Sequence, residues 1–266
     1  MMEQRDFYQV IRDKCRIPTR SRTDSIVGRV QTCITSTFSF QPKTETVWAA
    51  TRHKDLTRKT RDFLWKSTQN TYKIGEFWEN ISGYEERGIS PICKTREDMD
   101  HILTECNAKA RSTAWNLADN LWVKRYNSHL PTNLGDILGC GLANFTSDDR
   151  PDEGKNRLYR ILMSETAYLI WKIGNERRIR DEDGEERATT PNETTTRWRN
   201  AINKRLITDR YLTDERRFGE KALDQNLVRK TWSGCLTNED SLPDDWYRNK
   251  GVLVGILWTA PLGAVT

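Results

Sequence analysis

The chain has 266 residues, of which 30% are charged, and a formal net charge of +5. Its mean hydropathy of −0.80 is near the polar end for globular proteins, and its length suits one large or two small domains. The start lacks the apolar segment of a secretory signal, and the apolar run after Val252 is too short to span a bilayer. Six cysteines are too sparse for a disulfide scaffold. We therefore expect an intracellular protein, in nucleus or cytoplasm, with no membrane partner.

Basic residues concentrate in the first quarter of the chain. Residues 1–66 hold 14 Lys and Arg against 7 Asp and Glu, whereas the remaining 29 and 31 nearly cancel. Apolar spacing predicts a basic helical segment over residues 1–45, with helices around Phe7–Ile11 and Ile26–Ile34. The loop between these helices supplies three candidates for phosphate contact: Arg16, Arg20 and Arg22. A solvated helix surface is the other explanation for such charges.

Aromatic side chains recur at helical spacing between Thr57 and Ile81. This pattern favours a packed core, because exposing so many rings would be costly. The same stretch supplies three more basic candidates for nucleic-acid contact: Arg58, Lys59 and Arg61. Rings beside cations can also stack bases, so base binding stays open as the alternative. Another amphipathic helix is expected from Ala114 to Trp122.

Polar and turn-forming residues over 146–156 mark the best linker candidate. After it, apolar spacing predicts a long helix from Leu158 to about Arg180 and shorter ones around Trp198–Asp209 and Leu227–Trp232. No alternating strand and helix pattern and no fixed repeat is present. The expected class is mainly α, with a small helical domain around a Cys/His segment and a second helical region over residues 157–266.

One short segment carries candidate metal ligands. Cys93, His101 and Cys106 have the spacing of a four-ligand zinc pattern in which Ser90 replaces an expected cysteine. Residues five apart on an ideal helix point about 140° away from each other, so Cys106 must lie at or beyond the helix end to share a metal with His101. Serine is a poor ligand, so water or another side chain such as His53 would have to complete the site. The alternative is a buried cysteine pair beside a hydrogen-bonded histidine.

A series of short runs occurs in a characteristic order: RHKD at 52–55, FLWK at 63–66, IGEFW at 74–78, EDMDHILTEC at 97–106 and a helix with Trp115 and Trp122. With the Cys/His spacing, they make residues 46–145 resemble the zinc-binding region that follows the reverse transcriptase and RNase H domains in fungal LINE-type (non-LTR) retrotransposon polyproteins. Later runs resemble the continuation of these polyproteins: ILGCGLANF at 137–145, RLYRILMSETAYLIWKIGNER at 157–177, NKRLITDRYLT at 203–213, TWSG at 231–234 and VLVGI at 252–256. The family pattern has cysteine at Ser90 and histidine at Gln69, and both departures suggest a truncated or relic fragment.

The resemblance implies a segment without catalytic activity, because the polymerase and RNase H activities of the family belong to upstream domains. The sequence contains no YxDD carboxylate pair, P-loop, HExxH or GxSxG motif. We therefore expect no catalysis and no small-molecule substrate, but contact with RNA or DNA through the basic part. The rival hypothesis is an interaction module without metal, which packs against reverse transcriptase or RNase H domains or against another copy.

Overall fold

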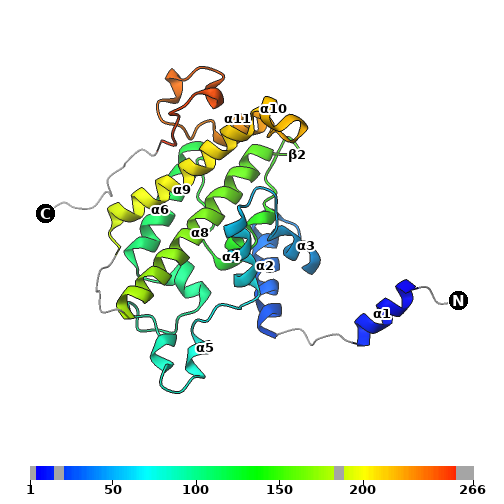
Figure 1. Cartoon of the computed structure of the whole chain (residues 1–266), viewed down its shortest axis with the longest axis vertical. Coiled ribbons are helices and arrows are strands. Elements are labelled where there is room, and N and C mark those ends of the chain that lie inside the picture. Colours follow the sequence, from blue (N-terminus) through cyan, green and yellow to red (C-terminus); the bar gives the residue numbers. More distant parts are fainter. Residues whose placement is uncertain (1–3, 15–20, 183–188, 256–266) are drawn as a thin grey trace.

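The structure is a computed structural model that describes residues 4–14, 21–182 and 189–255, and it is mainly helical, as the sequence predicted (Figure 1). The longer helices are α1 (Gln4–Lys14), α2 (Ser21–Phe38), α3 (Thr44–Ala50), α4 (Arg58–Thr68), α6 (Lys109–Tyr126), α8 (Glu153–Glu182), α9 (Pro191–Leu212) and α11 (Gln225–Trp232). The shorter helices are α5 (Glu76–Glu79), α7 (Leu134–Leu138) and α10 (Glu215–Phe218), with brief turns at η1 (Glu85–Gly88), η2 (His101–Glu105), η3 (Cys140–Leu142), η4 (Gly219–Lys221), η5 (Glu239–Ser241) and η6 (Trp246–Arg248). The strands β1 (Thr146–Ser147) and β2 (Arg150–Pro151) pair antiparallel.

Polar residues just before the first turn explain where several helices begin. At the start of α4, the Thr57 side chain accepts a hydrogen bond of 3.2 Å from the Thr60 backbone N–H. Thr190 caps α9 in the same way, with 3.1 Å to the Glu193 N–H. Pro191 fills the first turn of α9, where no backbone donor is needed. These helix starts are therefore determined by local sequence.

The long helix α8 lies at the centre of the molecule and packs against α4, α6, α9 and α11 (Figure 1). Side chains from these helices and from α2, α3 and α7 form one hydrophobic core. Its largest fully buried members are Trp122, Trp198, Trp232, Tyr159 and Phe63. Within the aromatic run, the predicted core role is confirmed for Phe63, whereas Phe77 is 40% exposed.

A network of buried charges joins α8 to distant parts of the chain. Arg157 donates to both carboxylate oxygens of Asp209, at 2.5 and 2.7 Å, and its Nε lies 3.2 Å from Asp55. Trp232 Nε1 also donates to Asp209, at 2.8 Å. Arg160 reaches the second oxygen of Asp55 at 3.1 Å. Because removing one partner would leave a buried charge unbalanced, this network fixes how α8, α9, α11 and the loop before α4 meet.

The predicted linker, residues 146–156, contains the β1–β2 hairpin and the first turn of α8. Asp148 and Asp149 form its turn with φ values of 49° and 60°. The Asn156 side chain closes it by donating to Phe145 O at 3.0 Å. The regions before and after the hairpin share one hydrophobic core. The predicted boundary thus coincides with a turn at the surface.

Helix α1 presents apolar side chains to solvent. Phe7, Tyr8 and Ile11 are 57%, 66% and 58% exposed, and Figure 1 shows the helix standing clear of the others. Together with α2, it places helices where apolar spacing predicted them in residues 1–45. Among the described helices, none combines the length and apolarity that a membrane span requires.

Candidate metal centre

A tight turn places Ser90 and Cys93 side by side. The Ser90 N–H donates to Thr95 O at 2.7 Å, and the Lys94 N–H donates to Ser90 O at 2.9 Å. Lys94 adopts a left-handed φ of 57°, which lets the chain reverse within these few residues. The turn therefore offers two neighbouring side chains to one point, which is how the first ligand pair of a zinc site is delivered.

The other two positions come from one widened helical turn, η2. Asp98 accepts a hydrogen bond of 2.8 Å from the His101 N–H, and the Cys106 N–H donates to His101 O at 2.7 Å. This bond between residues five apart defines a π turn, which brings Cys106 back over His101. Cys106 is the residue directly after η2. The prediction that it lies at the helix end is confirmed.

The donor atoms of Cys93, His101 and Cys106 converge, since one from each lies within 4.8 Å of the other two. The two sulfur atoms are 3.8 Å apart. Two sulfurs bound to one tetrahedral zinc ion at about 2.3 Å would be separated by about 3.8 Å. His101 is buried, and its Nε2 has no hydrogen-bond partner in the described part of the chain. Two thiols and an imidazole nitrogen that needs a partner fit zinc.

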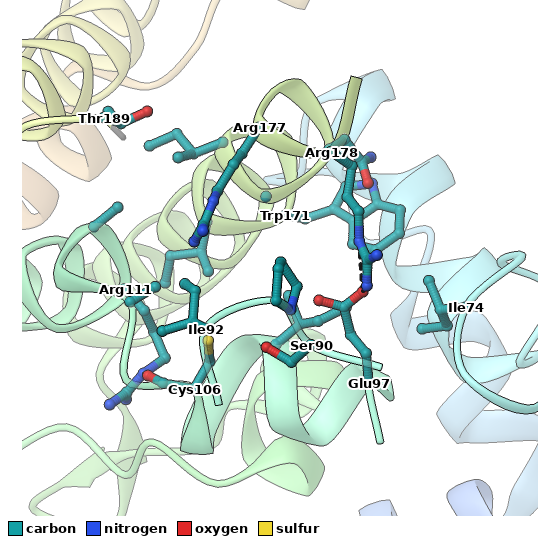
Figure 2. A pocket seen from close by; sticks show the side chains of 18 of the residues that line it. Ile74, Ser90, Ile92, Glu97, Cys106, Arg111, Trp171, Arg177, Arg178 and Thr189 are labelled. Carbon is teal, nitrogen blue, oxygen red and sulfur yellow. Dashed lines mark hydrogen bonds and ion pairs between the residues drawn. The ribbon is translucent and has the colours of Figure 1, made fainter. Parts of the chain in front are cut away.

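Ser90 lies beside Cys93 and Cys106 at the edge of this cluster and is 1% exposed. Its Oγ accepts a 3.4 Å hydrogen bond from the Cys93 N–H and hydrogen-bonds the Cys106 thiol. Figure 2 shows the Ser90 hydroxyl facing the Cys106 sulfur. A hydroxyl ionises far less readily than a thiol, so the set consists of three good donors and one weak one.

The protonation of the cluster follows from its burial. Burial raises the pKa of the Cys106 thiol, and the hydrogen bond with Cys93 raises it further. Cys106 is therefore protonated at neutral pH until a metal displaces the proton. Glu105 Oε2 lies 3.9 Å from His101 Nδ1, which is too far for a hydrogen bond. The alternative to a metal site was a buried cysteine pair beside a hydrogen-bonded histidine. Among the described residues, neither nitrogen of the His101 ring has a hydrogen-bond partner that would support it.

His53, the residue suggested as a replacement ligand, is not part of the cluster. Its Nδ1 accepts a hydrogen bond of 3.2 Å from the Asp55 N–H and lies 3.3 Å from the Asp55 carboxylate. Burial, followed by the charge of Arg160, lowers the pKa of His53. That expectation was wrong because the loop before α4 packs against the buried charges of α8 and not against η2.

The chain was compared with protein-family models, with curated proteins and with solved structures. No match was found. The resemblance of residues 46–145 to retrotransposon zinc-binding regions therefore stays a prediction, and the chemistry of the cluster is the basis for inferring function.

The four predicted nucleic-acid contacts that the structure describes do not share one surface. Arg16 and Arg20 lie outside the described residues. Arg22 forms an ion pair with Glu76. Arg61 donates to two backbone oxygens of the preceding loop, both at 3.1 Å. Two of the six guanidinium and ammonium groups are thus engaged within the fold.

Arg58 and Lys59 remain exposed at the start of α4. The exposed Lys204 of α9 joins them, because both lysines lie close enough to Glu165 to lower its pKa. Arg22 lies near the opposite end of α4, about 15 Å along the helix. Lys204 was missed in the sequence because nothing local shows that Lys204 of α9 and Lys59 of α4 both lie near Glu165 of α8.

A cavity of about 710 Å³ opens beside the cluster, and Ser90 and Cys106 form part of its wall (Figure 2). Much of the remaining wall is apolar and includes Ile92, Trp171 and Ile173. No sequence signal indicated this cavity, since its wall joins side chains from residues 73–111 to side chains from the second half of α8, and these two parts lie far apart in the chain.

Proposed function

We propose that this chain is a non-enzymatic helical module organised by zinc, of the kind that its resemblance to retrotransposon zinc-binding regions implies. The supporting observations are the convergence of donor atoms from Cys93, His101 and Cys106 and a buried His101 Nε2 that has no hydrogen-bond partner among the described residues. Zinc bound there would tie the turn at 90–95 to η2 and the start of α6. Such a link lets metal binding contribute directly to folding free energy.

Zinc content and stability test this proposal together. Protein purified without chelator should contain about one zinc per chain, and chelation should lower the urea midpoint of unfolding. His101→Ala should abolish both the bound zinc and the decrease of the urea midpoint on chelation. His129→Ala is the matched control, because His129 lies beyond the end of α6, is 82% exposed and contacts Asp119 of α6. A zinc-free wild type with an unchanged midpoint would contradict the proposal and favour the metal-free interaction module.

Contact with RNA or DNA is a second candidate function. It is supported by the exposed cations of Arg58, Lys59 and Lys204 on adjoining parts of α4 and α9. Side chains of this type bind the phosphate backbone by charge and carry little sequence information.

A double variant, Arg58→Ala with Lys59→Ala, tests the nucleic-acid candidate. It should bind single-stranded RNA or DNA several-fold more weakly, and the slope of log affinity against log salt should fall by about 1 to 2. Arg229→Ala with Lys230→Ala removes the same charge from exposed positions of α11 and should leave binding unchanged. Equal weakening in both variants would show only a general effect of net charge.

The interaction module is favoured by one other observation, the exposed apolar side chains of α1. Phe7, Tyr8 and Ile11 would be covered if α1 packed against another protein or a second copy. Phe7→Asp with Ile11→Asp should then reduce concentration-dependent association in analytical ultracentrifugation. A wild type that stays monomeric at all concentrations would remove self-association from this alternative.

A further inference from the structure

We infer that the cavity beside the cluster receives a small apolar thiol, whose sulfur takes the fourth coordination position next to Ser90. This inference rests on the proposed zinc site and deepens it, because it names the class of molecule that the incomplete ligand set can accept.

Cys106 belongs both to the cluster and to the cavity wall, and Ser90, whose Oγ accepts a hydrogen bond from the Cys93 N–H, also lines the cavity. In Figure 2 the Cys106 sulfur and the Ser90 hydroxyl lie at the cavity wall, with Ile92 next to them. A site closed by four thiolate or imidazole ligands leaves no room for an outside donor, whereas three protein donors leave one position exchangeable. Because Ser90 supplies the weak donor and also lines the cavity, we expect the exchangeable coordination position to face the cavity.

The volume and the apolar part of the wall make the cavity suitable for an apolar ligand. Its volume of about 710 Å³ lies within the range of small-molecule sites. Six isoleucines and two tryptophans supply apolar surface, among them Ile92, Ile102, Ile170, Ile173, Trp78 and Trp171. Trp171 is held against Tyr72, with ring centroids 4.3 Å apart, so this part of the wall is fixed before a ligand arrives.

The charges around the cavity favour a ligand that binds as a negatively charged thiolate. Its described lining includes one carboxylate, Glu97, and six cationic side chains: Lys73, Arg87, Lys109, Arg111, Arg177 and Arg178. Arg178 is held in place by Glu97, and Arg111 donates to Cys106 O. Zinc with two thiolates and a neutral imidazole has no net charge, so a third thiolate adds one negative charge that these cations offset.

The chemistry of this step is a ligand exchange without oxidation or reduction. The incoming thiol would give its proton to solvent, one metal–sulfur bond would form, and the weak bond between the metal and the Ser90 hydroxyl oxygen would break. Sulfur is preferred over oxygen because zinc in a thiolate-rich site binds soft donors well.

Cobalt substitution with thiophenol as the probe tests the inference. The visible spectrum of the Co²⁺-loaded wild type should change on titration with thiophenol while the bound cobalt stays constant, and phenol should produce no change. The Co²⁺-loaded Ser90→Cys variant should show the spectrum of a site with four protein ligands before any thiophenol is added. This spectrum should not change when thiophenol is titrated. An unresponsive, cobalt-loaded wild type would overturn this inference alone, whereas failure to bind Co²⁺ at all would overturn it together with the zinc proposal.

A second variant separates the cavity from the cluster. Gly174 lines the cavity, and a Cβ built there meets nothing within 4 Å, so Gly174→Phe starts its side chain without a clash and adds a ring at the cavity wall. This variant should keep the cobalt spectrum of the wild type but need at least about tenfold more thiophenol for the same spectral change. An unaltered thiophenol titration would show that the thiol does not occupy the cavity and would overturn the inference.

Discussion

Asp209 accepts hydrogen bonds from Arg157 and Trp232 at a site where it is 2% exposed. Asp209→Asn keeps the shape of the side chain but removes the charge that balances the Arg157 guanidinium. We expect the free energy of unfolding to fall by about 3 kcal/mol or more, as measured by urea unfolding. Asp240→Asn, at an exposed position of η5, should change it by less than about 0.5 kcal/mol. Similar small losses in both variants would contradict this account of the network.

Glu165 should give the fold a measurable dependence on pH. Burial raises the pKa of its carboxyl, although the Arg205 Nε lies 3.8 Å away. A carboxyl with a higher pKa in the folded state than in the unfolded state destabilises the fold while it is ionised. This effect is therefore present at neutral pH and fades as pH falls through the folded pKa toward the ordinary value of 4.5.

Glu165→Gln removes the ionisable group and isolates this effect. The stability of the variant relative to wild type should be highest near pH 7 and should decline as the pH approaches about 4. Urea midpoints of both proteins across this range provide the measurement. A constant difference would mean that the folded and unfolded pKa values of Glu165 are equal.

Two glycines of α8 allow a matched comparison of how helices pack. A Cβ at Gly154 would lie 2.2 Å from Lys230 O of α11, whereas one at Gly174 meets nothing within 4 Å. Gly154→Ala should therefore force α11 away from α8 and lower the free energy of unfolding by about 1 to 3 kcal/mol. Gly174→Ala should raise it by about 0.5 to 1 kcal/mol, because alanine favours helix more than glycine. Thermal unfolding of the pair measures both changes, and a destabilised Gly174→Ala would show that α8 needs flexibility there.

The helices themselves could be predicted because their signals are local. Apolar spacing indicated α8 and α9, and the angle per residue placed Cys106 after the end of η2. The predicted linker at 146–156 contains a β-hairpin whose composition is as polar as that of a linker. Composition alone therefore could not distinguish a hairpin from a linker. The pairing of Arg157 with Asp55 could not be predicted either, since a single sequence does not show which distant charges meet.

The continuous core makes a prediction for the whole molecule. Because buried side chains before and after the hairpin at 146–156 belong to one cluster, residues 21–255 should unfold as one cooperative unit. Tryptophan fluorescence and far-ultraviolet circular dichroism should then give the same urea midpoint. Two separate transitions would instead support the division into two helical domains that the sequence predicted.

The buried charge network also limits when this chain can fold during synthesis. Asp55 must wait for Arg157, 102 residues later, and for Arg205, whose guanidinium reaches the Asp55 backbone oxygen across 150 residues. A nascent chain that has left the ribosome only as far as α8 would hold Arg157 without Asp209. Stable structure should therefore appear late in translation, after α9 has emerged, and until then the aromatic residues of α4 and α6 should stay accessible to solvent.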